Sequence, residues 1–301
     1  SIAAILGMRL RQVCNESGLN HYMGIAISAF VATIIAWAST LLPAEWTSTP
    51  WHPLLACALF IVPGVPLINF VDDMLDNYIQ VGIVRAVNTL LMVAAMAFGI
   101  AFAVKLCHIE NFFPTISMVP HHQYWEYAIA AAISAMGFSM IFNIQRRLLW
   151  VVAIGGIIAV CTRNFVNLGP STDNIGLDMG LVIGSFSGAV LVSLIAIKAV
   201  HWFHVPNHVL TIPSVIPMIP GVLMYRMLFG IININVQSID QVTPLMKAIE
   251  SGVNSGLVIM CIALGVAIPN IFGRRFIASS KNKRLAELLK ERKARGKFVE
   301  W

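Results

Sequence analysis

Charged residues are scarce in this chain. Asp, Glu, Lys and Arg make up 11% of its 301 residues, hydrophobic residues make up 58%, and the mean hydropathy is +0.79. Soluble globular domains carry roughly 25% charged residues, so this composition excludes an ordinary soluble fold. The formal charge of +6 is concentrated at the C-terminus, where it marks a membrane flank and gives no reason to expect a nucleic-acid partner. The sequence therefore predicts an all-α polytopic membrane protein.

Recognisable catalytic and metal-binding motifs are also missing from the sequence. It contains no CxxC, HExxH or GxSxG, and its five cysteines are scattered, which is typical of small buried apolar residues. His201, His204 and His208 have a spacing that resembles a metal site. Pro206 interrupts this stretch and no cysteine or acid joins it, so we interpret it as an interfacial loop. We expect no metal, no cofactor and no enzyme activity.

Apolar runs long enough to cross a bilayer, roughly 20 residues each, follow one another along the chain. The first run, 2–10, is too short, so we expect the chain to begin within a helix and to lack one further span upstream. The tail after Arg274 is basic, and we expect it to be helical and held near anionic lipid. Eight full spans are predicted, at about 22–42, 53–77, 79–106, 125–143, 146–165, 177–201, 207–232 and 245–272.

Two of the predicted spans are interrupted by proline and glycine. The stretch IVPGVPLINFVDDMLDN contains Pro63 and Gly64, and the stretch VIPMIPGVLMYR contains Pro220 and Gly221. Proline removes backbone hydrogen bonds that lipid cannot replace, so such a break persists only where protein or a water-filled cavity covers it. Broken helices at matching places in two halves indicate the binding site of a transporter.

The two halves of the chain repeat each other. Pro63-Gly64-Val65 matches Pro220-Gly221-Val222, and Val87-Asn88-Thr89 matches Val253-Asn254-Ser255, at a separation that widens only where the second half has a longer loop. Equivalent spans lie five spans apart along the chain. Each span reverses the direction in which the chain crosses the membrane, so an odd number of spans predicts inverted five-helix repeats. The predicted domains are the first repeat at 1–106, incomplete at its N-terminus, an inter-repeat loop at 107–124, the second repeat at 125–272 and a basic cytoplasmic tail at 273–301.

Basic residues are distributed unevenly over the span ends. If the tail is cytoplasmic, Lys105, Arg163 and Lys247 fall outside, and most of the other basic residues near span ends fall inside. This bias agrees with the positive-inside rule and predicts a cytoplasmic C-terminus. The residues assigned to the inside are Arg9, Arg11, Arg85, Arg146, Arg147, Lys198, Arg274 and Arg275.

The segment PGVPLINFVDDMLDNYIQVGIVRA resembles the threonine/serine exporter (ThrE) family. GFSMIFNIQRRLLW and IPSVIPMIPGVLMYR resemble the family's second module, which is sometimes a separate polypeptide, as in two-component exporters proposed to handle succinate. Asp72 stands where relatives commonly have a basic residue, Asp76 adds a further acid, and the family's N-terminal module is absent. The family's Pro-Gly-x-Pro-Leu-x-Asn, Asp and Gly-x-x-Arg pattern corresponds to Pro63, Gly64, Pro66, Leu67, Asn69, Asp73, Gly82 and Arg85.

The resemblance implies a secondary exporter in a bacterial-type cytoplasmic (inner) membrane. Its substrate would be a small hydrophilic carboxylate, first threonine or serine and second a dicarboxylate such as succinate, and protons and the lipid bilayer are the other expected partners. Whether the chain forms a homo-oligomer is left open. An intramembrane enzyme that uses Asp72, Asp73 or a histidine, and a passive channel, are the alternative functions. Adjacent aspartates diverge on a helix, which does not favour a catalytic dyad.

The candidate site residues flank the two breaks. Carboxylates near a broken helix can change protonation as the site alternates its exposure, so Asp72, Asp73 and Glu250 are candidates for proton coupling; a solvated cap is the alternative for the aspartates. The candidate substrate-binding residues are Pro63, Gly64, Asn69, Asp73, Arg85, Asn88, Pro220, Gly221, Tyr225, Arg226 and Asn254.

Several of these candidates have a structural alternative. Arg85 can either pair with a carboxylate or extend to the cytoplasmic interface. Asn88 and Asn254 can either face each other across the pseudo-twofold axis or form hydrogen bonds between helices. Tyr225 can also be an interfacial anchor.

Overall fold

The structure is a computed structural model that describes residues 2–38, 64–107, 123–170, 175–203, 205–232 and 242–294. These residues form helices joined by turns and short connections, with no strand among them. Within this part of the chain, five helices are long and apolar enough to cross a membrane, and they are His21–Ala38, Ile79–Leu106, Arg146–Asn167, Gly180–Val200 and Leu245–Gly273. The prediction of an all-α polytopic membrane protein is confirmed.

The first half of the chain contains α1 (Ile2–Glu16), α2 (His21–Ala38), α4 (Gly64–Leu75) and α5 (Ile79–Leu106). α5 has the bounds predicted for its span, whereas α1 continues well beyond the short apolar run 2–10. α1 packs on α2, α2 on α5, and α5 on α4. Residues 53–63 of the first predicted broken span, 53–77, lie outside the described residues, and its second part forms α4.

The second half is a bundle in which α7 contacts α6, α8 and α9, and α8 contacts α9 and α11. Its described elements are α6 (Tyr124–Ile141), the 3₁₀ turn η3 (Arg146–Leu148), α7 (Leu149–Asn167), α8 (Gly180–Phe203), α9 (Asn207–Val215), the 3₁₀ turn η4 (Ile216–Met218), α10 (Gly221–Ile232) and α11 (Val242–Ala294).

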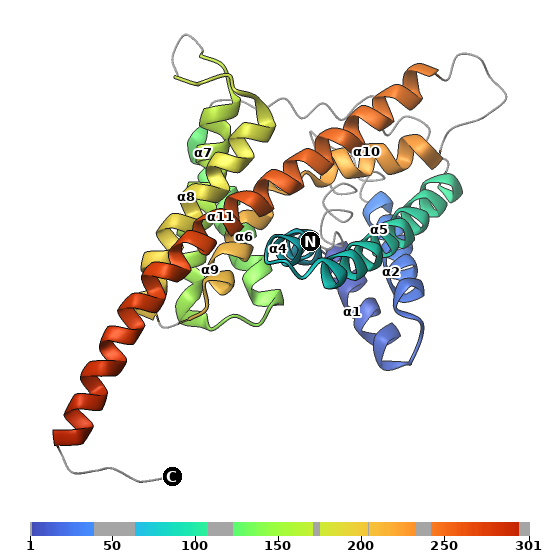
Figure 1. The fold of residues 1–301 in the computed structure, drawn as a ribbon. Helices are drawn as coiled ribbons and strands as arrows, with labels where there is room; N and C mark the ends of the chain where they lie inside the picture. The colour runs from blue at the N-terminus through green and yellow to red at the C-terminus, as the bar shows by residue number, and fades with distance from the viewer. Residues whose placement is uncertain are drawn as a thin grey trace.

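The second predicted broken span consists of three elements instead of one helix. α9 continues into η4, and the chain then becomes extended at Ile219 (φ −61°, ψ 129°). Proline disfavours the helical conformation of the residue before it, so Pro220 explains why the helix stops at this point. α10 begins at Gly221 and packs along α11, in a different direction from α9 (Figure 1).

The last predicted span and the basic tail form one continuous helix. α11 runs from Val242 to Ala294 and contains Pro269, so the predicted border at 272/273 lies inside a helix. In Figure 1, α1, α2 and α5 lie on one side of the molecule and α6 to α9 on the other, with α4, α10 and the first part of α11 between them.

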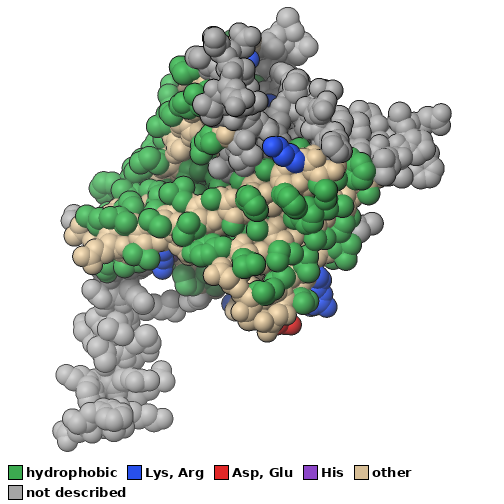
Figure 2. Space-filling view, turned by 90° about the vertical axis from the view of Figure 1, so that its right-hand side faces the viewer, with side chains coloured by type: hydrophobic (Ala, Val, Ile, Leu, Met, Phe, Trp, Pro, Cys, Tyr) green, Lys and Arg blue, Asp and Glu red, His purple; other side chains and the backbone are tan. Residues whose placement is uncertain are grey.

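α4 inserts its apolar face into the second half. Ile68 and Val71 are buried, at 1% and 5% exposure, in one hydrophobic core with residues of α6, α7, α8, α9 and α11. The outward surface is apolar as well: Phe98 and Phe102 of α5 are 67% and 56% exposed, and hydrophobic side chains cover most of the described surface in Figure 2. An outward face of this kind suits lipid, not water.

Candidate functional site

The two helix breaks lie against each other. A Cβ atom added to Gly64 would lie 2.7 Å from Cδ1 of Ile219 and 3.8 Å from the side chain of Ile216. Gly64 is the first residue of α4, and Ile219 directly precedes Pro220 and the start of α10. The start of α4 and the break between η4 and α10, far apart in sequence, therefore meet between the two halves.

Asp73 and Arg85 form an ion pair across the tight turn between α4 and α5. The distance from Asp73 Oδ2 to Arg85 Nη1 is 2.5 Å, and the two side chains are 21% and 49% exposed. α4 ends at Leu75, and Asn77 adopts a left-handed conformation (φ 68°), which asparagine tolerates better than most residues, and so reverses the chain into α5. Of the two interpretations of Arg85, the geometry agrees with the one in which Arg85 pairs with a carboxylate.

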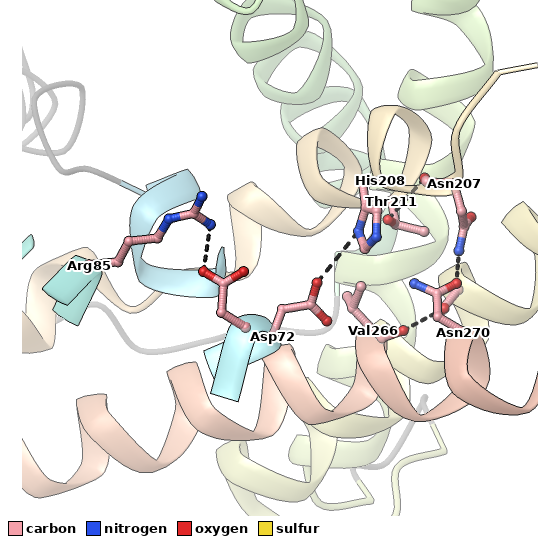
Figure 3. Close-up of polar contacts among 9 residues, drawn as sticks. Asp72, Arg85, Asn207, His208, Thr211, Val266 and Asn270 are labelled. Atoms are coloured by element: carbon pink, nitrogen blue, oxygen red, sulfur yellow. Dashed lines mark hydrogen bonds and ion pairs between the residues drawn. The ribbon is translucent and has the colours of Figure 1, made fainter. Parts of the chain in front are cut away.

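Asp72 reaches the other half of the molecule. Its Oδ2 lies 3.9 Å from Nδ1 of His208 on α9 (Figure 3). The adjacent aspartates therefore diverge: Asp73 is held by the first half and Asp72 faces the second. Imidazole is charged only when protonated, so this contact is an ion pair only in that state.

A buried amide pair lies close to His208. Asn207 on α9 donates a hydrogen bond from Nδ2 to Oδ1 of Asn270 on α11. The remaining polar atoms of the pair, Asn207 Oδ1 and Asn270 Nδ2, are buried and have no partner in the described part of the chain. Thr211 Oγ1 donates to the Asn207 carbonyl, so polar contacts extend from α5 through α4 and α9 to α11 (Figure 3).

The two candidate asparagines have different surroundings. Asn88 accepts a hydrogen bond from the hydroxyl of Tyr22 at 2.7 Å, which links α5 to α2. Asn254 is exposed on α11, as is Glu250. The interhelical interpretation therefore fits Asn88, and the structure provides no contact between the two asparagines.

The remaining candidates cluster around the breaks or cannot be placed. Asn69 on α4 and Arg226 on α10 are partly buried, and Gly221 is buried at the start of α10. Pro63 and the side chain of Tyr225 lie outside the described residues.

The fold brings two residues to this region that the sequence did not identify as site residues. The interpretation of His208 as part of an interfacial loop is wrong, because His208 lies within α9 and faces Asp72. The sequence identifies Arg163 only as a charge near a span end, yet its Nη1 lies 3.4 Å from the carbonyl oxygen of Met218, at the second break. The available signal was an arginine inside an otherwise apolar run. His204 lies outside the described residues, and no cluster of three metal-binding side chains occurs among those that are described.

Comparison with known proteins covers both halves. Residues 127–272 match the family model described as "Threonine/Serine exporter, ThrE", and residues 1–107 match a second model described as "Putative threonine/serine exporter". No solved structure matches the chain.

Two curated relatives match part of the chain. Over 104 residues it is 34% identical to a protein of Klebsiella aerogenes and 32% identical to one of Escherichia coli K12, both named "Probable succinate transporter subunit YjjP". Each match covers 35% of this chain and 40% of the relative, so the chain spans about two fifths of these relatives. The family and the relatives are transporters, not enzymes. The two family models together leave out only residues 108–126 and 273–301, and the chain belongs to the threonine/serine exporter family.

Proposed function

We propose that the protein is a secondary exporter that moves small hydrophilic carboxylates out of the cytoplasm by alternating access. The contact between Gly64 and Ile219 carries the proposal, because it places the ends of two broken helices together. Free amides and carbonyls at such ends form the substrate sites of many secondary transporters. L-Threonine and L-serine are the first candidates from the family, and succinate is the alternative because of the relatives' names.

The packing of the helices supports an inverted repeat. α5 packs on α2 and α4, and α11 packs in the same way on α8 and α10. Across the halves, α4 contacts α11 and α10 contacts α5. α5 and α11 run in opposite directions (Figure 1), which an inverted pair requires. We infer that the two units exchange their contacts as the site opens to one side and then the other.

We also infer that export is coupled to protons through the aspartates of α4. Asp72 and His208 join the two halves, so the protonation state of this pair decides whether α4 is attracted to α9. Asp73 and Arg85 are the neighbouring charges, and Glu250 remains a further candidate. The protein would lie in a bacterial-type cytoplasmic membrane with its C-terminus inside, and the relatives' description as subunits favours assembly into an oligomer.

Transport by proteoliposomes tests the proposal. The protein is reconstituted with radiolabelled L-threonine, L-serine or succinate and a pH gradient is imposed. We expect one solute to accumulate against its gradient in the wild type, and Asp73→Asn or Arg85→Gln to slow that transport by about tenfold or more, because each leaves a charge at the site without its partner. Arg147→Gln is the matched control, since Arg147 is exposed and its side chain donates a hydrogen bond to the neighbouring Gln145.

Three results would contradict the exporter. Flux that only dissipates a gradient indicates a channel, and chemical conversion of the solute indicates an enzyme. Absence of flux for all three solutes under every gradient would refute export of this substrate class.

A further inference from the structure

Arg163 is an arginine inside a candidate membrane span, and no carboxylate of the described residues pairs with it. It lies in α7, within the candidate span Arg146–Asn167, and its side chain is partly buried. Its hydrogen bonds go to uncharged oxygens: Nη1 donates to the Met218 carbonyl at 3.4 Å, and Nε and Nη2 donate to Oδ1 of Asn164 at 3.3 Å. Among the described residues no Asp or Glu forms an ion pair with it. A charge at this place is costly unless an anion accompanies it.

Asn164 adds a second group that lacks its partner. It is buried, at 2% exposure, and its Nδ2 donor has no hydrogen-bond partner among the residues that the structure describes. Its Oδ1 already accepts two hydrogen bonds from the guanidinium of Arg163. The atoms of the two side chains that can still form hydrogen bonds are therefore N–H donors. Buried donors without acceptors are rare in folded proteins and call for an explanation.

The pair lies beside the contact between the start of α4 and the second break. Met218, whose carbonyl oxygen accepts from Arg163, ends η4, and Ile219, the next residue, contacts Gly64. Arg163 packs beside α8, because a Cβ atom on Gly184 would lie 2.6 Å from the Arg163 carbonyl oxygen. Gly184 comes four residues after α8 begins, which corresponds to about 6 Å along the helix at 1.5 Å per residue.

We propose that Arg163 and Asn164 bind the carboxylate of the transported substrate. The proposal rests on the exporter function and identifies which group of the substrate is held at the second break. A carboxylate supplies two acceptor oxygens, which the guanidinium can bind side by side while Nδ2 of Asn164 donates to one of them. A cationic or purely hydroxylated solute offers no such match to two donors and a positive charge.

Binding of carboxylate and amide ligands tests this assignment. Equilibrium binding of radiolabelled L-threonine and succinate to purified protein is compared with competition by L-threonine amide. We expect Arg163→Gln to weaken binding of the acids by about tenfold or more, as loss of a charge-assisted hydrogen bond requires. Arg163→Lys should give a smaller loss, because lysine retains the charge without the planar pair of donors. The wild type should prefer acid to amide, and Arg163→Gln should lose that preference.

Asn164→Asp provides an independent test that does not depend on removing the charge. It places a carboxylate beside Arg163, so we expect a higher melting temperature together with loss of ligand binding. Arg147→Gln, at an exposed arginine, should match the wild type in both measurements.

The outcomes separate this inference from the exporter function. If Arg163→Gln and Asn164→Asp both bind the acids as the wild type does, the carboxylate lies elsewhere and the inference fails while export can still be observed. If the acids bind through Arg163 but are not moved across vesicles, the subsite stands and the exporter function fails. A wild type that binds neither acid overturns both.

Discussion

Gly99 of α5 lacks a side chain, and this allows α5 to pack closely against α2. A Cβ atom there would collide with the backbone oxygen of Ala26, so α5 and α2 touch backbone to backbone. Backbone cannot yield as a flexible side chain can, and we expect Gly99→Ala to destabilise the protein by about 1–3 kcal/mol. Thermal unfolding in detergent measures this.

Gly137 offers the matched control for that substitution. It lies on α6, another helix, and a Cβ atom there would meet nothing within 4 Å. Alanine is the better helix former, so Gly137→Ala should leave the melting temperature unchanged or raise it. Equal losses at the two positions would refute the close packing of α2 on α5.

Individual side chains were the hardest part of the site to predict from the sequence. The Asp73–Arg85 pair was within reach, because a turn of a few residues joins their helices. His208 and Arg163 were missed because their partners, Asp72 and Met218, are many residues away and become neighbours only through tertiary packing. Spacing within one helix carries no information on such contacts.

At the scale of elements, the length of the apolar run predicts both ends of α5 correctly, but it does not predict where α11 ends. The run behind α5 is bounded on both sides by polar residues, whereas the helix of α11 continues from apolar into basic sequence without a stop signal. The second break was predicted from Pro220, but its division into α9, η4 and α10 depends on which neighbours each piece packs against.

The contact between α4 and α9 makes a coupling between the two halves testable. Asp72 Oδ2 lies 3.9 Å from Nδ1 of His208, so Asp72→Asn and His208→Gln each remove one partner of the same contact. We expect the double variant to transport no more slowly than the slower single variant, because partners in one contact are not additive. Rates measured in the same proteoliposomes check this, and losses that simply add would show that the two residues act independently.

At the scale of the whole molecule, inversion of the repeats predicts which ends face which side. Gln80 in α5 and Thr243 in α11 are both exposed, and each is the second residue of its helix. With single cysteines at these positions in a cysteine-free protein, a membrane-impermeant maleimide should label Gln80→Cys from one side and Thr243→Cys from the other. Labelling of both from the same side would refute the inverted arrangement.

The two neighbouring carboxylates of α4 link this short helix to two different neighbours. Consecutive residues of an α-helix point about 100° apart around its axis. Asp73 contacts Arg85 of α5 and Asp72 contacts His208 of α9, so the two contacts lie on different faces of α4. A rotation of α4 about its own axis would therefore change its contacts with both halves at once.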